Sequence, residues 1–347
     1  MPNNVVVSVI IINWNGQKDL SGCLTSLKKV KDVEFEVILV DNGSTDQSAK
    51  VAQKIFPDVH VIRNQHNLGY APANNQGLAG ARGEFILFLN NDTKVTDDFL
   101  KILVSILKAD PKIAAVQPKI YLMGRGQMLD AVGSFLTWTG FLDHFGYERR
   151  DGPQYAKPRE IFSAKGACML FRKSVLDQIG NFDNLFFAYF EETDLCWRAW
   201  LAGYRVSYVP QAVIYHKGGA TAHRLPEAIS LYHSYKNRIR TFIKNFAVVN
   251  LVRVLFVHSL ICTFLVLAHL LMGRTSQALA IVRAYWWNIT VLSDTLQERT
   301  RVQALRQVGD KQLFGPLVRH KGLVQYLKEV YFSFFIAPKI RQEKMGW

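Results

Sequence analysis

Two polar clusters, far apart in the chain, contain residue types that metal binding and acid–base chemistry require. Asn90-Asn91-Asp92 directly follows the apolar run 85–89, and Glu191-Glu192 stands among aromatic residues. Oxygen ligands at the end of a strand suit a hard cation such as Mg²⁺ or Mn²⁺. Carboxylates among aromatic side chains lose hydration, which raises their pKa toward that of a general base.

Each cluster also has a simpler explanation, and both explanations stay open at this point. Asn and Asp favour tight turns, so Asp92 could serve as a turn residue. Acidic residues favour helix N-termini, and Glu191, Glu192 and Asp194 precede a helical stretch. We expect Asp194 to brace that helix start or to pair with Arg198.

Alternating strands and helices are expected to position these clusters. The unbroken β-branched run 5–12 is typical of a strand buried on both faces of a parallel sheet. Asn13, Asp41 and Asn90 follow three of the expected strands, so we expect them at one edge of a doubly wound α/β sheet. The expected strands are 5–12, 36–40, 59–63 and 85–89, and the expected helices are 19–29, 48–56 and 71–81.

The chain beyond residue 98 has weaker periodicity. A helix over 99–108 and strands over 114–118 and 166–171 are expected. The Gly- and aromatic-rich stretch 121–158 shows little periodicity, and we interpret it as a loop region that shapes a substrate site.

Charge is concentrated in the C-terminal third. The chain has 347 residues, 49% of them hydrophobic, and a formal charge of +14. Residues 231–347 hold 17 Lys and Arg against 5 Asp and Glu. No recognition helix, zinc pattern or stacking motif accompanies this charge, so we do not expect a nucleic-acid partner.

The nearly uncharged stretch 254–273 is long enough to span a bilayer. His258, His269 and Cys262 give it a weakly polar stripe, which favours a helix lying in the membrane interface or packed on protein. Together with Trp286 and the basic, aromatic segment 326–339, it predicts peripheral binding to an anionic membrane surface. A single transmembrane span and a buried core helix are the alternatives.

The cysteines indicate a reducing compartment. They are widely spaced and form no CxxC pair, which argues against a disulfide framework or a zinc site. The apolar run 5–12 lacks the basic flank and cleavage site of a signal peptide. We therefore expect the catalytic region at the cytoplasmic face of the cell membrane. The cysteines are Cys23, Cys168, Cys196 and Cys262.

Six short motifs in order resemble those of family 2 glycosyltransferases, over about residues 5–240. Within that family the chain is most similar to bacterial rhamnosyltransferase-like members that build cell-surface polysaccharides. The motifs are 7–13, 40–46, 67–70 (Asn-Leu-Gly-Tyr), 89–92, 180–183 (Gly-Asn-Phe-Asp) and the Glu191 block.

The resemblance implies a glycosyltransferase A fold, with a Rossmann-like, mostly parallel sheet. It implies a catalytic domain over residues 1–240, and the basic, helical, membrane-associating region follows over 241–347. It also implies inverting transfer from a nucleotide-diphosphate sugar, with Mg²⁺ or Mn²⁺. The membrane-associating region suggests a lipid-linked acceptor, and a polysaccharide acceptor is the alternative. Deoxythymidine-diphosphate L-rhamnose is the first expected donor, uridine-diphosphate hexoses are next, and homo-oligomerisation stays open.

The family positions carry over residue by residue. Glu192 matches the base, with Glu191 as the fallback, and Asp92 and His216 match metal ligands, while the glycines after His216 offer amides to phosphate. Asn90 replaces a common carboxylate, which puts metal affinity in doubt, and the second Glu replaces a common Asp. The expected nucleotide-sugar-binding residues are Asn13, Asn15, Asp41, Gly43, Asn67, Gly69, Asn90, Asn91 and Gly166.

Two other functions compete with transfer. A non-catalytic nucleotide-sugar-binding or scaffold protein of a membrane assembly would keep the same fold with an idle site. A dehydrogenase is disfavoured, because 13–16 is Asn-Trp-Asn-Gly and not the Gly-rich loop that binds dinucleotides.

Overall fold

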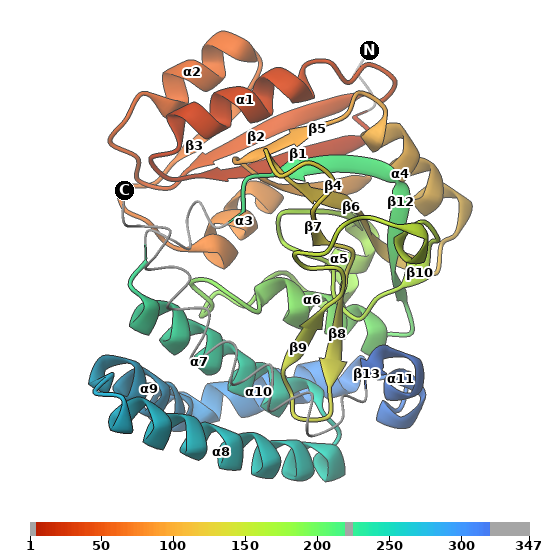
Figure 1. The fold of residues 1–347 in the computed structure, drawn as a ribbon. Coiled ribbons are helices and arrows are strands. Elements are labelled where there is room, and N and C mark those ends of the chain that lie inside the picture. Colours follow the sequence, from red (N-terminus) through yellow and green to blue (C-terminus); the bar gives the residue numbers. More distant parts are fainter. Residues whose placement is uncertain (1–4, 219–224, 320–347) are drawn as a thin grey trace.

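A mostly parallel sheet organises the N-terminal two thirds of the chain. The computed structural model describes residues 5–218 and 225–319. The strand order is β10-β12-β6-β11-β4-β1-β2-β3, with β5 on β12 and β7 on β6 (Figure 1). β1 runs parallel to β2 and β4, whereas β11 runs antiparallel to β4 and β6. The main strands are β1 (Val7–Asn13), β2 (Phe35–Asp41), β3 (His60–Arg63), β4 (Phe85–Asn90), β5 (Thr93–Val95), β6 (Ile113–Leu122), β11 (Cys168–Arg172) and β12 (Arg205–His216).

Helices cover both faces of the sheet, which explains why the central strands are mostly apolar. Ile10 and Ile38 pack under α3, α5 and α6, while the neighbouring Ile11 and Leu39 pack under α1, α2 and α4. Successive side chains of a strand point to opposite faces, so both sets must be apolar. The expected doubly wound α/β sheet is confirmed. These helices are α1 (Gln17–Leu27), α2 (Ser48–Ile55), α3 (Tyr70–Ala79), α4 (Phe99–Ala109), α5 (Lys173–Ile179) and α6 (Glu191–Leu201).

The strand register brings the expected polar residues to one edge. Asn13 of β1 pairs with Asp41 of β2, and Ile12 pairs with Asn90 of β4. Asn42 N donates to Asn13 O at 2.8 Å, which extends this alignment by one residue. The carboxyl ends of three parallel strands therefore present their loops side by side, as predicted.

The stretch 121–158 is more regular than expected. It contains β7 (Leu129–Ala131), β8 (Ser134–Thr137), β9 (Leu142–His144) and the 3₁₀ turn η1 (Pro153–Tyr155). β8 pairs with β9 and with β13 (Val318–Arg319), while β10 (Arg159–Glu160) joins the main sheet. The interpretation as a loop region is wrong for these strands, because three or four residues contain too few alternations to reveal their period.

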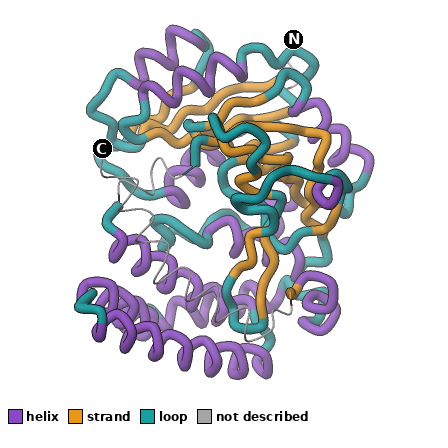
Figure 2. Tube along the Cα trace, in the orientation of Figure 1, coloured by secondary structure: helices purple, strands orange, loops and turns teal. Residues whose placement is uncertain are grey.

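Five helices complete the described chain beneath the sheet. Figure 2 shows the main sheet in the upper part of the view, with β8 and β9 extending downward from it, and the helices labelled α7 to α10 in Figure 1 as a layer below the sheet. α8 is long and apolar enough to cross a membrane by length and composition. The expected domain boundary at residue 240 falls within α7, while the segment 326–339 and Gly219 lie outside the described residues. The helices are α7 (Glu227–Asn245), α8 (Val248–Leu271), α9 (Thr275–Thr290), α10 (Leu292–Ala304) and α11 (Asp310–Leu317).

Candidate active site

A cavity of about 300 Å³ opens at the carboxyl edge of the sheet, between the ends of β1 and β4, the start of α6 and the end of β12. This volume and position suit a small-molecule site in an α/β sheet. Both polar clusters identified in the sequence reach it. The predicted residues that line it are Asn67, Gly69, Asn90, Asn91, Asp92, Gly166, Glu191, Glu192 and His216.

The other predicted residues, at the ends of β1 and β2, support the loops around the cavity. Asn13 is fully buried and accepts a hydrogen bond from Asn91 Nδ2 at 2.6 Å. Asn15 Oδ1 accepts from Thr45 N at 2.8 Å, and Asp41 Oδ1 accepts from Ser44 N at 3.2 Å. Their roles, and that of Gly43, toward a nucleotide therefore stay predictions.

Gly43 and Gly69 occupy turns that exclude a side chain. Gly43 has φ +81° and Gly69 has φ +91°, which are left-handed values. A Cβ on Gly69 would lie 2.5 Å from Phe187 O, and Tyr70 N donates to that oxygen at 2.6 Å. The Asn67–Tyr70 motif thus joins the start of α3 to the aromatic segment before α6.

Asp92 and His216 form the cation-binding candidate. His216 Nε2 lies 3.1 Å from Asp92 Oδ1, and both side chains are buried beside the cavity. On its other side, His216 Nδ1 is 2.7 Å from Asp130 Oδ2, and Lys165 Nζ is 2.6 Å from Asp130 Oδ1. The Nδ1 contact fixes the ring so that Nε2 faces Asp92 and the cavity.

This pair fits a cation that also takes ligands from its substrate. Among the residues that the structure describes, no group of three or more His, Cys, Asp and Glu is arranged to hold a metal. Mg²⁺ is commonly held by one or two protein groups plus substrate phosphates, and Mn²⁺ also prefers oxygen ligands. Asp92 and His216 therefore suit a cation that arrives with a diphosphate.

Electrostatics at this pair follow from the two carboxylates. Burial lowers the pKa of His216, but the hydrogen bonds to Asp130 and Asp92 outweigh burial and raise it to about 9. Burial raises the pKa of Asp130, while His216 and the charge of Lys165 bring it down to about 2. Without a cation, the histidine keeps its proton between two carboxylates.

The acidic doublet begins α6 after a strained turn. Tyr189 and Phe190 have φ of 71° and 72°, left-handed values that side chains rarely adopt. Asn237 of α7 holds this turn, because its Nδ2 donates to Tyr189 O at 2.6 Å and to Ala188 O at 2.9 Å. α7 therefore sets the direction in which α6 starts.

Glu191 and Glu192 differ in their surroundings. Glu191 is 7% exposed, and its Oε2 has no hydrogen-bond partner in the described part of the chain. Glu192 is half-buried, and its carboxyl carbon lies 3.9 Å from a Cβ built on Gly166. Burial, and for Glu191 also the charge of Glu192, raises the pKa of both carboxyls. Glu192 is the more accessible of the two for a proton transfer.

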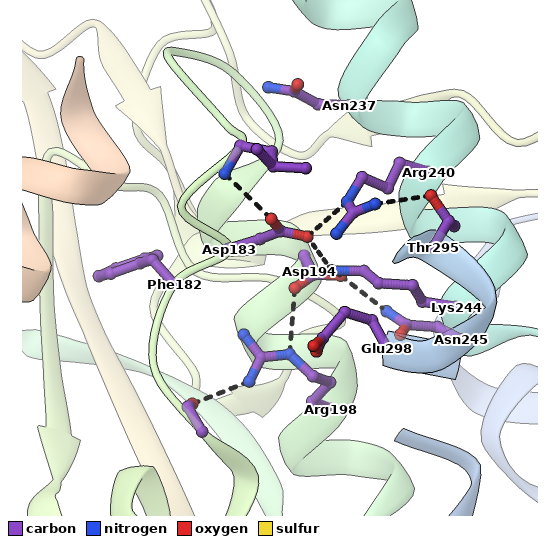
Figure 3. A network of polar contacts seen from close by, with 12 residues as sticks. Phe182, Asp183, Asp194, Arg198, Asn237, Arg240, Lys244, Asn245, Thr295 and Glu298 are labelled. Carbon is purple, nitrogen blue, oxygen red and sulfur yellow. Dashed lines mark hydrogen bonds and ion pairs between the residues drawn. The ribbon is translucent and has the colours of Figure 1, made fainter. Parts of the chain in front are cut away.

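A buried ionic network fixes this region to the C-terminal helices (Figure 3). Asp183 contacts Arg240 Nε at 2.7 Å and Lys244 Nζ at 2.6 Å, and Lys244 also lies 3.0 Å from Asp194. Asp194 pairs with Arg198 at 3.0 Å, as predicted. The turn before α6 and α6 itself are thus tied to α7.

Several cavity residues were not predicted as site residues, although some of them lie within the motifs. Tyr70 OH donates to Gly166 O at 2.9 Å, which links the loops of Gly69 and Gly166. An aromatic residue after a glycine gives no specific signal of such a contact. Lys165 precedes Gly166 directly and had a weak signal, as a lone cation at the start of a buried strand. The missed residues include Trp14, Asn42, Tyr70, Lys165, Phe187 and Tyr189.

Comparisons with known proteins agree on one class of fold and one class of catalytic domain. Residues 8–180, about half of the chain, match the family model described as glycosyl transferase family 2. The chain is 27% identical over 254 residues to N-acetylglucosaminyl-diphospho-decaprenol L-rhamnosyltransferase of Mycobacterium tuberculosis, covering 66% of this chain and 81% of that protein. It is 31% identical over 233 residues to the O-antigen biosynthesis protein RfbC of Myxococcus xanthus, covering 63% and 18%.

Solved structures share the fold at low identity. GalNAc-T7 with UDP, GalNAc and Mn²⁺ superposes with a TM-score of 0.56 at 19% identity, over 70% of this chain, which spans about half (48%) of that chain. TarS of S. aureus, residues 1–349 with UDP-GlcNAc, superposes with a TM-score of 0.54 at 20% identity, over 87% of this chain and 84% of that one. The expected glycosyltransferase A fold is confirmed.

Proposed function

We propose that this chain, which belongs to glycosyl transferase family 2, transfers a sugar from a nucleotide-diphosphate donor to a glycan acceptor with inversion at the anomeric carbon. The observation that carries the proposal is the shared cavity. It places the Asp92–His216 pair and Glu192 on the walls of one space at the carboxyl edge of the sheet. A donor diphosphate and an acceptor hydroxyl must meet in such a space.

The donor's diphosphate would lie toward Asp92 and His216, which would hold Mg²⁺ or Mn²⁺. When bound, the cation neutralises the negative charge that grows on the departing diphosphate. Lys165 Nζ, half-buried beside Asp130, adds a fixed positive charge to the same wall. Asp130 holds the His216 ring in place from behind.

Glu192 would take the proton from the attacking acceptor hydroxyl. Its raised pKa, caused by burial, suits a carboxylate that must accept a proton near neutral pH. Glu191 is less exposed and better suited to bracing the start of α6. The idle-site alternative would leave an accessible carboxylate, oriented by the turn at Tyr189 and Phe190, without a task.

The finer assignments come from the relatives. The Mycobacterium tuberculosis relative is named for an L-rhamnose transfer and a diphospho-decaprenol acceptor. We therefore propose deoxythymidine-diphosphate L-rhamnose as the first donor to test, uridine-diphosphate hexoses next, and a lipid-linked glycan as the acceptor. Peripheral residence at the cytoplasmic face of the cell membrane, within cell-surface polysaccharide synthesis, is part of the same proposal.

A panel of nucleotide sugars tests the activity. Release of free nucleoside diphosphate is measured with Mn²⁺, Mg²⁺ or chelator, in the presence of membrane extract as acceptor. We expect one donor to be consumed, and Asp92→Ala to abolish the release. Asp97→Ala is the matched control, because Asp97 is an exposed carboxylate on the same segment. No release from any donor by the wild type would favour the idle-site alternative.

A further inference from the structure

Among residues 5–218 and 225–319, protein covers α8 along one stripe and leaves the opposite stripe bare. Most of the exposed large apolar residues of α8 recur every three or four positions, which is the spacing of a single helix face, and Val248 and Leu270 are exposed beside them. The last of them, Leu271, is 90% exposed. The bare stripe consists of Val249, Val252, Phe256, Leu260, Phe264, Leu267 and Leu271.

The opposite stripe of α8 is built into the protein. His258 is fully buried, with its Nδ1 3.1 Å from Thr139 O and its ring 4.8 Å from that of Phe141. Cys262 and Leu265 are buried with residues of α7 and α9. A helix crossing a bilayer alone would be apolar all round and would not bury a polar stripe against its own domain. This packing argues that α8 lies along the membrane and does not cross it.

α9 repeats the arrangement beside α8. Ile281 and Ala284 join Cys262 and Leu265 of α8 in one buried cluster around Tyr235. Both helices rest on that cluster, so their bare sides face away from it. Figure 1 shows α8 and α9 adjacent at the lower edge of the molecule, on the side away from the sheet. The exposed apolar residues of α9 are Leu279, Val282, Trp286 and Ile289.

The charges around this surface fit an anionic partner. Residues 248–290 contain three arginines and no Asp or Glu. Arg253 and Arg283 are exposed and Arg274 is half-exposed. A second copy of this surface would bring the arginines together with no acidic residue from the same helices to balance them. Phosphate-bearing lipid headgroups balance them, and exposed tryptophan such as Trp286 suits the headgroup level.

One end of the α8–α9 hairpin is connected to the wall of the cavity. Leu225 lines the cavity, and α7 begins two residues later at Glu227. Glu227 Oε2 accepts a hydrogen bond from Gln277 Nε2 of α9 at 3.3 Å. Gln277 follows the short turn after Leu271, so this end of the hairpin contacts the segment that contributes Leu225 to the cavity wall.

We propose that the docking face, defined as the exposed apolar residues of α8 and α9, lies flat on an anionic bilayer without crossing it. Docking there would hold the cavity entrance near the headgroups, where a lipid-anchored acceptor displays its glycan. The statement about the acceptor rests on the proposed transferase function, whereas the docking itself does not.

Vesicle binding of the full-length protein tests the docking face. Partition onto phosphatidylglycerol–phosphatidylcholine vesicles and onto pure phosphatidylcholine vesicles is measured by flotation. We expect binding to the anionic vesicles that weakens with salt, and at least about a 10-fold lower partition coefficient for Phe264→Ser/Trp286→Ser. Leu292→Ser/Leu296→Ser on α10 is the matched control, since it also removes two exposed apolar residues.

Each outcome decides the proposal. Equal vesicle binding by the wild type and Phe264→Ser/Trp286→Ser, or no binding by the wild type, would overturn it. A dimer in sedimentation that Phe264→Ser/Trp286→Ser abolishes, without vesicle binding, would assign the face to a second copy. Protein that resists alkaline extraction from vesicles would indicate a crossing. Donor consumption on a soluble acceptor should be unchanged in this variant, so failure of docking and failure of the transferase activity are separable.

Discussion

Replacement of Asp130 by Asn would separate the two effects that this buried carboxylate has on His216. Asp130 Oδ2 lies 2.7 Å from Nδ1 of the ring, so it orients Nε2 toward Asp92. It also helps to keep the proton on the ring, since it contributes to a pKa of about 9. Cation binding requires neutral imidazole, and at pH 7 such a pKa leaves only about 1% of the sites deprotonated.

The two effects oppose each other and depend differently on pH. Loss of an orienting partner weakens cation affinity by about 10- to 100-fold. Loss of the carboxylate also lowers the pKa of His216, which frees more of the ring at low pH. We therefore expect wild-type Mn²⁺ affinity to rise about 10-fold per pH unit from pH 6.5 to 8.5, and that of Asp130→Asn to rise less steeply. The difference in Mn²⁺ affinity between the wild type and Asp130→Asn should therefore be largest at pH 8.5.

The affinity for Mn²⁺ can be measured without turnover. The electron paramagnetic resonance signal of the free ion reports how much Mn²⁺ the protein binds in the absence of substrate. Asp97→Asn is the control and should bind Mn²⁺ as the wild type does. A variant with unchanged affinity at both pH values would refute the positioning role of Asp130. If the Mn²⁺ affinity of Asp130→Asn fell further below that of the wild type as the pH decreases, this would refute the idea that a proton competes with Mn²⁺ for His216.

Three further outcomes follow from the contacts described. Because burial raises the pKa of Glu192, the transfer rate should fall with decreasing pH around a midpoint above the ordinary carboxyl pKa of 4.5. Glu192→Asp should still show a fall in rate toward acid pH in the same pH–rate profile. Lys244→Met leaves Asp183 with one fewer partner in a buried network and should lower the free energy of unfolding by about 3–5 kcal/mol in denaturant titration. The depressed pKa of Asp183 adds stability that is complete above about pH 4 and is lost as the pH falls, so the effect of Lys244→Met should shrink in acid. Gly69→Ala should destabilise by about 1–3 kcal/mol, whereas Gly80→Ala, whose Cβ meets only an oxygen at 3.8 Å, should change stability little in the same titration.

The sheet was predictable because burial on both faces produces a local signal. Strands such as β1 are apolar at nearly every position, and the polar residues at their ends then stand out as loop residues. Asp92 and the Glu191-Glu192 doublet stood out for the same reason, since each stands at the end or the start of an element, whereas His216 was found only through the family resemblance.

The supporting residues were not predictable, because their partners are distant in the sequence. Asp130 lies in the three-residue strand β7 and meets His216 only in the folded chain, 86 positions later. Asn237 reaches back to the turn at Ala188 from the middle of α7. Neither residue has a neighbour of its own chemical type that would mark it. The bare stripe of α8 was similarly hidden, because only His258 and His269 mark the buried side of a helix that is otherwise almost entirely apolar.

The most direct test of the central claim measures two quantities in the same samples. One is the transfer of a labelled sugar to a lipid-linked acceptor from the donor that the panel identifies, and the other is the binding of that donor. Wild type and Glu192→Gln are compared at saturating Mn²⁺. We predict equal donor binding and transfer that is about 10²- to 10⁴-fold slower in the variant. Transfer by Glu192→Gln at the wild-type rate would contradict the assignment of Glu192, and donor binding without any transfer by the wild type would contradict the transferase itself.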